Sequence, residues 1–590
     1  MININSIVYS LSVLLMISQV YAYTPMSTTL NNTQTNMGLR SNGVIDITLI
    51  SDSSIAVGTG DGIGIGVFRN GELFFSNLSS TNLPLGGFPS VISKNNIIAV
   101  SGVSDTIALG ESMPKGTGIG YSMDLGSSWH YFKQPIDSLP NVFSCPYSDN
   151  LNNYYQESDS LICESECIYP FSCNQPQKKC IRIYDWIDWG SQDSIRHLST
   201  TVDIWNVTYD MSLADDYLYT ASFTGGLRRL KISDEEDAAY GDWEVIPLPM
   251  DSQKNLLCGQ IDTNSYEYDV NDSCPSDNNP CDEYNPNKCN PYLSGEMNHK
   301  VYSVYTQEDT IWVGTANGIN KGTIVGDCID WKHINSNNSD ISGNWVVGFT
   351  VQSTDFGDIV YAITWPTDDG EFSSVSYSFN GGVSWSPVEQ FKEYGVKVFE
   401  LDSDDYRVYA ATDNGLFVSE NYGQYWERYS RPSDSSGEQI LSEKVYSVLS
   451  IDNANKLIIG SDDGVAVTSD DGLTWDVYRF WSKSAETVSF NPYPNPFYRK
   501  YSNVVRDNGN VRFIINDANG VLPNAVVGID VYDFSMDRVA NIINPIILDD
   551  GVEFIWDGLN NYRMPVPNGT YFCRLEYNNS YYWTKLVVIN

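Results

Sequence analysis

Short runs in which apolar residues alternate with polar or small residues cover most of the chain. One of them is IWVGT at 311–315, which leads through Asn317 and Gly318 into a second apolar run. Such alternation predicts half-buried β-strands, and an Asn-Gly or Asp-Gly pair between two runs predicts a tight hairpin. The sequence is therefore expected to fold as an all-β protein.

The strand pattern repeats along the chain. The segment KVYSV occurs at 300–304 and again at 444–448, a separation of 144 (444 − 300). The hairpin glycines Gly318, Gly415 and Gly464 lie 97 (415 − 318) and 49 (464 − 415) residues apart. A period of about 48 residues fits both spacings and is typical of four-stranded propeller blades. We expect seven blades, near residues 43–79, 88–135, 199–249, 300–335, 344–391, 395–430 and 444–482.

A turn motif, S/T-x-D-x-G-x-S/T-W, occurs four times with small departures. Its side-chain oxygens can accept hydrogen bonds from the backbone of the turn, and its glycine can adopt a positive φ. Its tryptophan can pack beneath the turn. The copies are Ser122, Asp124, Gly126 and Trp129; Ser378, Asn380, Gly382 and Trp385; Ser419, Asn421, Gly423 and Trp426; and Thr468, Asp470, Gly472 and Trp475.

These four turns resemble the Asp-box (BNR) repeats of sialidase-like β-propellers. The resemblance implies a β-propeller, which agrees with the seven blades counted from the repeats, and we place this propeller over residues 23–487. Two copies have Asn380 and Asn421 in the position of the acid, and an amide cannot act as a general acid. We therefore interpret the boxes as structural turns rather than as catalytic sites.

Two loop-like insertions, near 136–198 and 250–299, interrupt the blade pattern. They hold nine of the eleven cysteines, five in the first insertion and four in the second. Clustered cysteines are typical of oxidising compartments, where disulfides staple loops. With Cys328 they make ten, enough for five bridges whose pairing stays open, and Cys573 is expected to be a buried strand residue.

The last hundred residues differ from the rest in composition and strand pattern. Pro492, Pro494 and Pro496 predict an extended linker, and alternating runs at 511–515, 527–533, 552–556, 569–575 and 582–589 predict a small β-sandwich over 488–590. We expect it to fold on its own core, made by Phe513, Val531, Trp556, Tyr571 and Val587.

Several motifs of this region resemble a known module. YPNPF at 493–497, WDG at 556–558, NGTY at 568–571 and KLVV at 585–588 together resemble the FlgD-like immunoglobulin module, and equally the C-terminal sorting domain of the type IX secretion system. The chain departs from that pattern at 562–564, YRM, where a glycine is usual. The resemblance implies a partner in the export machinery.

Charge and the N-terminal segment indicate where the protein works. The chain has 34 Lys+Arg and 74 Asp+Glu residues, a net charge of −40, which disfavours nucleic acids and anionic membranes as partners. Residues 6–20 form an apolar run of signal-peptide length, followed by the small-residue site at Ala22, so we expect residues 1–22 to be a signal peptide. No later stretch is long and apolar enough for a transmembrane segment. A secreted or outer-surface location follows.

The best ligand candidate is YDWIDW at 184–189, which closes the first insertion. Aromatic faces beside carboxylates suit sugar rings, whereas the alternative is that the tryptophans anchor the insertion to the blades. The candidate residues are Tyr184, Asp185, Trp186, Asp188 and Trp189. We expect no metal and no cofactor, because the chain has four histidines and neither an H-E-x-x-H nor a C-x-x-C motif.

Two functions remain open from the sequence. The first is a secreted or surface propeller that binds a glycan or protein without catalysis. The second is a secreted glycoside hydrolase, sialidase-like or of another Asp-box type. The Arg-Ile-Pro string of sialidases is absent, and the nearest string, RIY at 182–184, lies far from the start of the propeller. We therefore assign no catalytic residues, and expect an enzyme to show converging carboxylates or arginines at one mouth of the ring.

Overall fold

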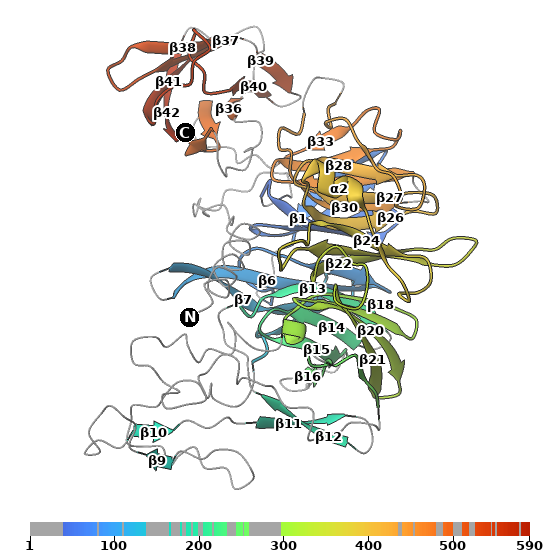
Figure 1. Cartoon of the computed structure of the whole chain (residues 1–590). Helices are drawn as coiled ribbons and strands as arrows, with labels where there is room; N and C mark the ends of the chain where they lie inside the picture. Colours follow the sequence, from blue (N-terminus) through green and yellow to red (C-terminus); the bar gives the residue numbers. More distant parts are fainter. Residues whose placement is uncertain are drawn as a thin grey trace. The chain divides into compact units, whose positions relative to one another are not determined.

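The protein is all-β in the computed structural model (Figure 1). The structure describes residues 39, 41–78, 82–108, 111–136, 164–166, 177–179, 184–189, 193–198, 205–214, 217–232, 243–251, 253–258, 297–434, 439–451, 455–479, 488–499, 510–517, 526–543, 545–548, 551–577 and 580–589. The expected signal peptide, 1–22, lies outside these residues.

The chain divides into two compact units. One holds residues 80–395 together with 1–24, and the other holds residues 25–79 and 396–590. Both units contain antiparallel meander sheets, in which consecutive strands pair because each turn reverses the chain onto its predecessor. The second unit also contains a C-terminal domain whose strands do not pair in chain order.

The first unit contains four meander sheets, beside two short hairpins from the first insertion. The strands of the first two sheets are β5(Val91–Lys94), β6(Ile97–Ala108), β7(Glu111–Ser122) and β8(His130–Phe132), then β13(Thr208–Ala214), β14(Tyr217–Ser222), β15(Gly226–Lys231) and β16(Trp243–Ile246). Those of the next two are β17(Asn255–Leu256), β18(Val301–Gln307), β19(Thr310–Thr315), β20(Gly318–Val325) and β21(Cys328–Ile334), then β22(Trp345–Gln352), β23(Ile359–Trp365), β24(Ser374–Ser378) and β25(Ser386–Pro387). The hairpins are β9(Glu164–Glu166) with β10(Gln177–Lys179), and β11(Tyr184–Trp189) with β12(Asp193–Leu198); the helical turns are η3(Met297–His299) and α2(Glu389–Tyr394).

The second unit contains three further meander sheets and a C-terminal domain of two sheets. The meander strands are β1(Val44–Ser51), β2(Ser54–Thr59), β3(Gly62–Arg69), β4(Glu72–Asn77); β26(Val398–Ser403), β27(Val408–Thr412), β28(Gly415–Ser419), β29(Glu427–Arg428); and β30(Val445–Ile451), β31(Lys456–Ser461), β32(Gly464–Thr468), β33(Asp476–Tyr478). The seven meander sheets of the two units fall inside the seven predicted blade ranges, except that β17 joins the fourth sheet from the second insertion. That all seven close into one ring stays a prediction.

The first strand of six meander sheets carries a β-bulge at the same place. The bulged residues are Ile45, Tyr209, Tyr302, Val347, Phe399 and Tyr446. A bulge re-aims a side chain out of the regular alternation. Consecutive first strands also meet through side chains: Asp210 Oδ2 accepts a hydrogen bond from the Val304 N–H (3.0 Å), and Glu400 Oε2 accepts one from the Val448 N–H (3.1 Å). First strands of neighbouring sheets therefore lie side by side within each unit.

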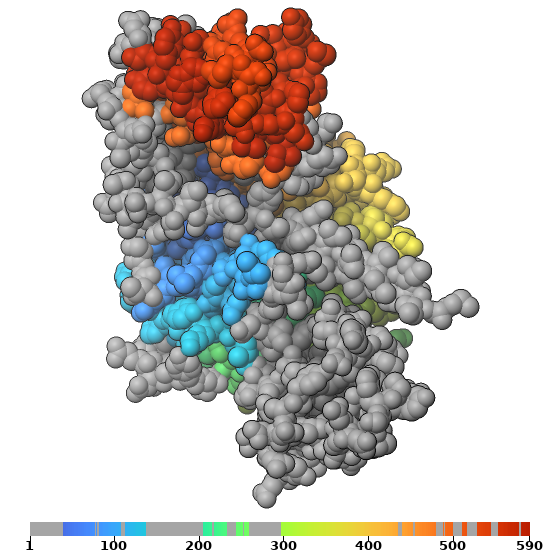
Figure 2. All heavy atoms as spheres, turned by 90° about the vertical axis from the view of Figure 1, so that its left-hand side faces the viewer, coloured from blue at the N-terminus to red at the C-terminus, as the bar shows by residue number. Residues whose placement is uncertain are grey.

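The C-terminal domain is a pair of sheets over one shared core, and Figure 2 shows it in red as a continuous body. One sheet has the order β34(Val488–Tyr493), β36(Val511–Asp517), β40(Gly551–Trp556), β39(Pro545–Leu548), and the other β35(Phe497–Tyr498), β42(Ser580–Ile589), β41(Gly569–Tyr577), β37(Val526–Tyr532), β38(Arg538–Ile542). The predicted core residues Phe513, Val531, Trp556 and Tyr571 are buried. Val587 is the exception, because its neighbours Leu586 and Val588 face the core.

The predicted proline linker is wrong. Residues 488–493 pair with β36 as an edge strand, and Phe490 and Phe497 belong to the core of the domain. Prolines are tolerated there because an edge strand leaves some backbone groups outside the ladder. The proline-rich stretch is thus the first part of the domain itself.

One disulfide joins described cysteines. Cys258, just after β17, is bonded to Cys328 at the start of β21, across 70 residues of sequence. It ties the beginning of the second insertion to the fourth meander sheet. A disulfide between two of the ten expected cysteines agrees with an oxidising compartment. Cys573 is a buried free thiol, as predicted. The remaining cysteines of the insertions lie outside the described residues.

Candidate functional site

The predicted ligand motif forms strand β11, antiparallel to β12. Trp186 pairs with Arg196 and Asp188 with Ser194 in the register of this hairpin. The side chains of Tyr184, Asp185, Trp186, Asp188 and Trp189 lie outside the described part of the structure, so the motif remains a prediction.

The four box turns connect the third strand of a meander sheet to the fourth. In the last copy, Thr468 Oγ1 accepts hydrogen bonds from the N–H groups of Asp470 (3.3 Å) and Gly472 (3.0 Å), and donates to Asp470 Oδ1 (2.8 Å). Asp470 in turn accepts from the Thr474 N–H (2.9 Å) and hydroxyl (2.6 Å). The copies at Ser122, Ser378 and Ser419 repeat this pattern, with Asn380 and Asn421 accepting through Oδ1.

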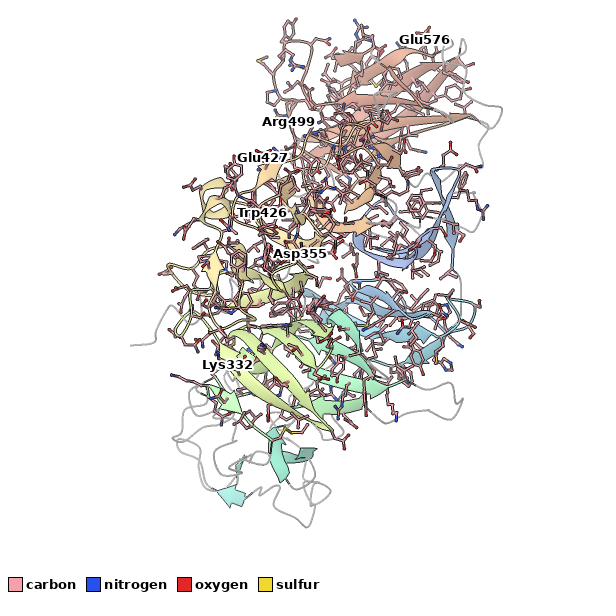
Figure 3. The ribbon with its side chains drawn as sticks, turned by 90° about the vertical axis from the view of Figure 1, so that its right-hand side faces the viewer. Lys332, Asp355, Trp426, Glu427, Arg499 and Glu576 are labelled. Carbon is pink, nitrogen blue, oxygen red and sulfur yellow. A yellow bond between two sulfur atoms is a disulfide. The ribbon has the colours of Figure 1, made fainter. Side chains whose placement is uncertain are left out.

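The tryptophans that end the boxes are buried under the turns, and none is helical. Trp426, labelled in Figure 3, donates from Nε1 to the Gly423 carbonyl at 2.9 Å, and Trp129 and Trp475 make the same bond to Gly126 and Gly472. Trp385 instead packs edge-on against Trp312, with ring centroids 5.9 Å apart, and its Nε1 has no hydrogen-bond partner. The box residues are thus engaged with one another.

Electrostatics agree with a structural role for the box acids. Several hydrogen bonds lower the pKa of Asp124 to about 2, and the bond from the Ser128 N–H contributes most. The Thr474 hydroxyl does the same for Asp470, whose pKa is also lowered. Carboxylates held in the ionised form by turn donors have no proton to give near neutral pH.

A cavity of about 180 Å³ lies between the sixth and seventh meander sheets, in the second unit. We call it the Arg407 cavity. Its walls come from the β26–β27 turn, the beginning of β27, the segment after β29, the β30–β31 connection and the last box. The lining residues are Asp404, Asp405, Tyr406, Arg407, Tyr409, Tyr429, Ser450, Ile451, Asn455, Lys456, Leu457, Thr468 and Asp471.

Three charged groups of the Arg407 cavity, Asp404, Arg407 and Asp471, are paired with one another. Asp404 accepts hydrogen bonds from the N–H groups of Tyr406 (2.9 Å) and Arg407 (2.7 Å), from Arg407 Nε (3.2 Å) and from the Tyr409 hydroxyl (2.8 Å). The second arm of Arg407 donates to Asp471 Oδ1 at 2.7 Å. Four donors saturate the Asp404 carboxylate, so it cannot also serve a substrate as a general acid.

The tyrosines that line the cavity differ in exposure: Tyr409 is buried, whereas Tyr406 is exposed. Burial raises the pKa of Tyr409, and the nearby Asp404 carboxylate raises it further, so this phenol stays protonated and donates. Burial would lower the pKa of Arg407, but Asp471 and Asp404 outweigh it and the pKa is raised. The Tyr406 side chain, by contrast, is 77% exposed. The exposed Tyr406 ring near the polar side chains of Ser450, Asn455 and Lys456 suits a polar ligand with flat or apolar parts, such as a sugar or a peptide.

Sequence reasoning missed this cavity. Its residues are spread over 404–471 and share no motif, and among the predicted motif residues only Thr468, in the fourth box, lines it. The signal present in the sequence was the D-D-Y-R run at 404–407, which reads as an ordinary hairpin turn.

Buried or half-buried lysines directly precede several first strands. Lys300 lies just before β18, with Nζ 5.5 Å from the Phe223 ring centroid and 3.2 Å from Met297 Sδ. Burial lowers its pKa to about 8, partly offset by Asp251. Lys397, before β26, has its pKa lowered to about 8 by burial, with Asp413 opposing and Lys444 adding to the effect. These lysines are held beside aromatic and carboxylate groups inside the protein.

Among the described residues, no group of three or more His, Cys, Asp or Glu side chains is placed to hold a metal ion. Within the same residues, no helix has the length and apolar character needed to cross a bilayer.

Comparison with known proteins gives structural neighbours only. No protein-family model and no curated protein matches the chain. Similar solved structures include PorZ, a surface component of the type IX secretion system of Porphyromonas gingivalis (11% identity, 95% of this chain and 77% of that chain, TM-score 0.30). Others are YCF48 from Cyanidioschyzon merolae (12%, 73% and 96%, TM-score 0.36) and the WD40 β-propeller domain of Doa1 (10%, 74% and 96%, TM-score 0.33). These neighbours include β-propellers, and likeness at this level carries no information about function.

Proposed function

We propose that the protein is a secreted or cell-surface β-propeller that binds a glycan or a protein without catalysis. In this proposal the seven meander sheets close into one ring and the four repeated turns are Asp boxes. The disulfide and the apolar N-terminal segment support the location outside the cytosol. An experimental structure with six or eight blades would contradict the ring.

The observation that supports binding rather than catalysis is the pairing inside the Arg407 cavity. A glycosidase needs two carboxylates, one able to give a proton and one able to act as nucleophile or base. Asp404 is saturated by four donors, and Asp471 is held by Arg407. This leaves Asp405 as the one further carboxylate among the described lining residues, which is short of the pair that a glycosidase needs. The polar and aromatic groups around it can recognise a ligand without transforming it.

The test is a glycan array on the full chain, followed by a hydrolysis assay on every glycan that binds. We expect Tyr406→Ala to weaken binding about tenfold or more, because it removes the exposed ring at the rim of the cavity. Tyr425→Ala is the matched control: its side chain is 55% exposed on the third box and does not line the cavity. Hydrolysis of a bound glycan, or equal effects of the two substitutions, would overturn the proposal.

The C-terminal domain is proposed to be an immunoglobulin-like, FlgD-like or type IX sorting module that addresses the chain to the outside. Two export signals in series, an N-terminal one and a C-terminal one, support this order of events. The test is export of a chain lacking 488–590 in a host with the type IX machinery. Retention of the truncated chain in the periplasm is expected; normal arrival outside would refute the address.

A further inference from the structure

The size of the Arg407 cavity limits what can enter it. Its volume is about 180 Å³, whereas pockets that enclose a whole drug-sized ligand measure about 300–1,000 Å³. The cavity therefore accepts one residue of a longer ligand, and the rest of that ligand lies outside it. The chemistry of the lining side chains decides which kind of residue fits.

The turn between β26 and β27 holds two of the lining residues in place. Asp404 accepts hydrogen bonds from the N–H groups of Tyr406 (2.9 Å) and Arg407 (2.7 Å), which closes the turn around its own carboxylate. Asp405 and Tyr406 lie on this turn, line the cavity and are exposed. Arg407 also fixes Asp471, on the neighbouring sheet, through a bond of 2.7 Å. A ligand thus meets groups that are already ordered, which lowers the entropic cost of binding.

Two carboxylates of the lining keep oxygens for a ligand. In the part of the chain that the structure describes, the exposed Asp405 side chain makes no hydrogen bond or ion pair. Asp471 is bonded to Arg407 through Oδ1 alone, and its side chain is 64% exposed. Its Oδ2 has no partner among the described residues. Asp405 and Asp471 are therefore the groups that can bind a cation, whereas Asp404 is saturated.

The two cations of the lining are engaged within the protein. Arg407 binds carboxylates through both Nε and Nη1. Lys456 Nζ lies 4.9 Å from the Phe68 ring centroid, which is within the range of a cation–π contact. An anionic ligand would have to compete for these cations, whereas a cationic ligand finds carboxylate oxygens without a partner.

The electrostatic balance of the cavity also favours a cation. Its lining holds two cations and three carboxylates, so the net charge is 2 − 3 = −1. Burial raises the pKa of Tyr429, Arg407 opposes this effect, and the carboxylates of Asp471, Glu420 and Asp404 raise the pKa further. Glu420 therefore adds to the negative potential in which the Tyr429 hydroxyl lies. The net charge of −40 on the whole chain acts in the same direction.

The uncharged part of the lining suits a sugar residue. The exposed Tyr406 ring contacts no other aromatic ring among the described residues, so it presents a flat face. The hydroxyl groups of Ser450 and Tyr429 and the side-chain oxygen of Asn455 have no hydrogen-bond partner within the same residues. Sugar hydroxyls can bond such groups while the face of the sugar stacks on the tyrosine. The methylene stem of a lysine side chain would leave these three polar groups unsatisfied.

We propose that the Arg407 cavity, taken as the binding site of the function proposed above, recognises an amino sugar whose amine is free and positively charged. The ammonium group binds the carboxylates of Asp405 and Asp471, and the sugar ring stacks on Tyr406. An N-acetyl group on the same nitrogen removes the charge, so the acetylated sugar binds more weakly.

The test uses the full chain and three oligosaccharides that differ only in the substituent on the second carbon of each sugar. They are hexamers of glucosamine, of N-acetylglucosamine and of glucose with the same β-linkage. Binding is measured by calorimetry below the pKa of the sugar amine, at about 0.15 M salt, which screens charges beyond about 8 Å. We expect the glucosamine hexamer to bind about tenfold more tightly than the other two, because hydrogen bonds between charged groups are stronger than neutral ones.

Two substitutions test the carboxylates, and a third is the matched control. Asp405→Asn should weaken binding of the glucosamine hexamer about tenfold and leave binding of the glucose hexamer unchanged. Asp471→Asn should act in the same direction, since asparagine keeps an oxygen for Arg407 and tolerates the φ of +57° at this position. Asp355→Asn removes the same charge from an exposed aspartate in the connection between β22 and β23 (Figure 3), and it should change nothing.

Each outcome decides between the amino sugar and an alternative. Equal effects of Asp405→Asn and Asp355→Asn would mean general attraction to an acidic chain and would overturn the proposal. Equal binding of the three hexamers would also overturn it, but sensitivity of that binding to Tyr406→Ala would leave the proposed function standing. Hexalysine is the peptide probe: if it binds through Asp405 and the glucosamine hexamer does not, the ligand is a protein and the proposal is wrong. Hydrolysis of the bound glucosamine hexamer would instead refute the function without catalysis and leave recognition of the amine intact.

Discussion

The buried charges between the last meander sheet and the C-terminal domain give the most demanding prediction. Arg512 is 1% exposed and makes four hydrogen bonds: to Asp463 Oδ2 (2.7 Å), to both Glu553 oxygens (2.7 and 2.9 Å) and to the Gln439 carbonyl (2.7 Å). Arg479 binds Asp463 as well, at 3.1 Å. Two arginines and two carboxylates therefore balance within a buried cluster.

Arg512→Met removes one cation and keeps the volume. Two buried carboxylates then share one arginine, and leaving a buried charge without its partner typically costs about 3–5 kcal/mol. A folded domain has a total stability of about 5–15 kcal/mol, so the loss is a large fraction of it. Adding Glu553→Gln removes the surplus charge, and we expect the double variant to recover part of the loss, with a coupling of about 1–3 kcal/mol.

The assay combines urea unfolding of the full chain with hydrogen exchange of peptides that cover β31–β32 and β36. We expect Arg512→Met to lower the unfolding free energy and to speed exchange on both sides of the contact. Arg574→Met is the control, because its ion pair with Asp530 is partly exposed and such pairs contribute about 0–1 kcal/mol. A loss below about 1 kcal/mol for Arg512→Met, or unchanged exchange in β31–β32, would refute the reasoning.

Three other predictions test single features. Lys300→Met should raise the unfolding free energy by up to about 3 kcal/mol at pH 7. Burial lowers the pKa of Lys300 from 10.5 to about 8, so the charged lysine destabilises the folded state below pH 8. Since the wild type regains this stability as pH rises from 8 to 10.5, the difference between the two proteins should vanish near pH 11 in thermal melts. Replacing Cys258 and Cys328 by serine should lower the unfolding free energy by about 2–4 kcal/mol, and a reducing agent should then have no further effect on the fourth sheet. Gly472→Ala should lower the unfolding free energy, measured by chemical denaturation, by about 1–3 kcal/mol, because φ is +79° and the new Cβ would lie 2.5 Å from a ring carbon of Tyr429. Gly326→Ala is the control and should lower it less, because φ is +63° but the space around it is open.

Much of the fold could be predicted from the sequence because it is local. Alternation, the Asn-Gly and Asp-Gly pairs and the box motif each act over about ten residues, and they located all seven meander sheets. The error at 490–497 has the same cause. Prolines disfavour a central strand, and no residue within that stretch indicates that β36, which follows later in the sequence, pairs with it and makes it an edge strand.

The sites were decided by tertiary structure. The sequence pattern shows which strand face is apolar, and so which side chains enter a core, but it does not show what covers the other face. Arg512 and Glu553 look like ordinary solvent-facing residues, but Asp463 packs against Arg512 and both are buried. Tyr581 and Trp583 look like core residues, but both are about half exposed. Asp404 likewise becomes a saturated turn anchor only when Arg407 and Tyr409 fold back onto it. Burial and pairing depend on which elements pack against one another, and the alternation along one strand does not specify its packing partner.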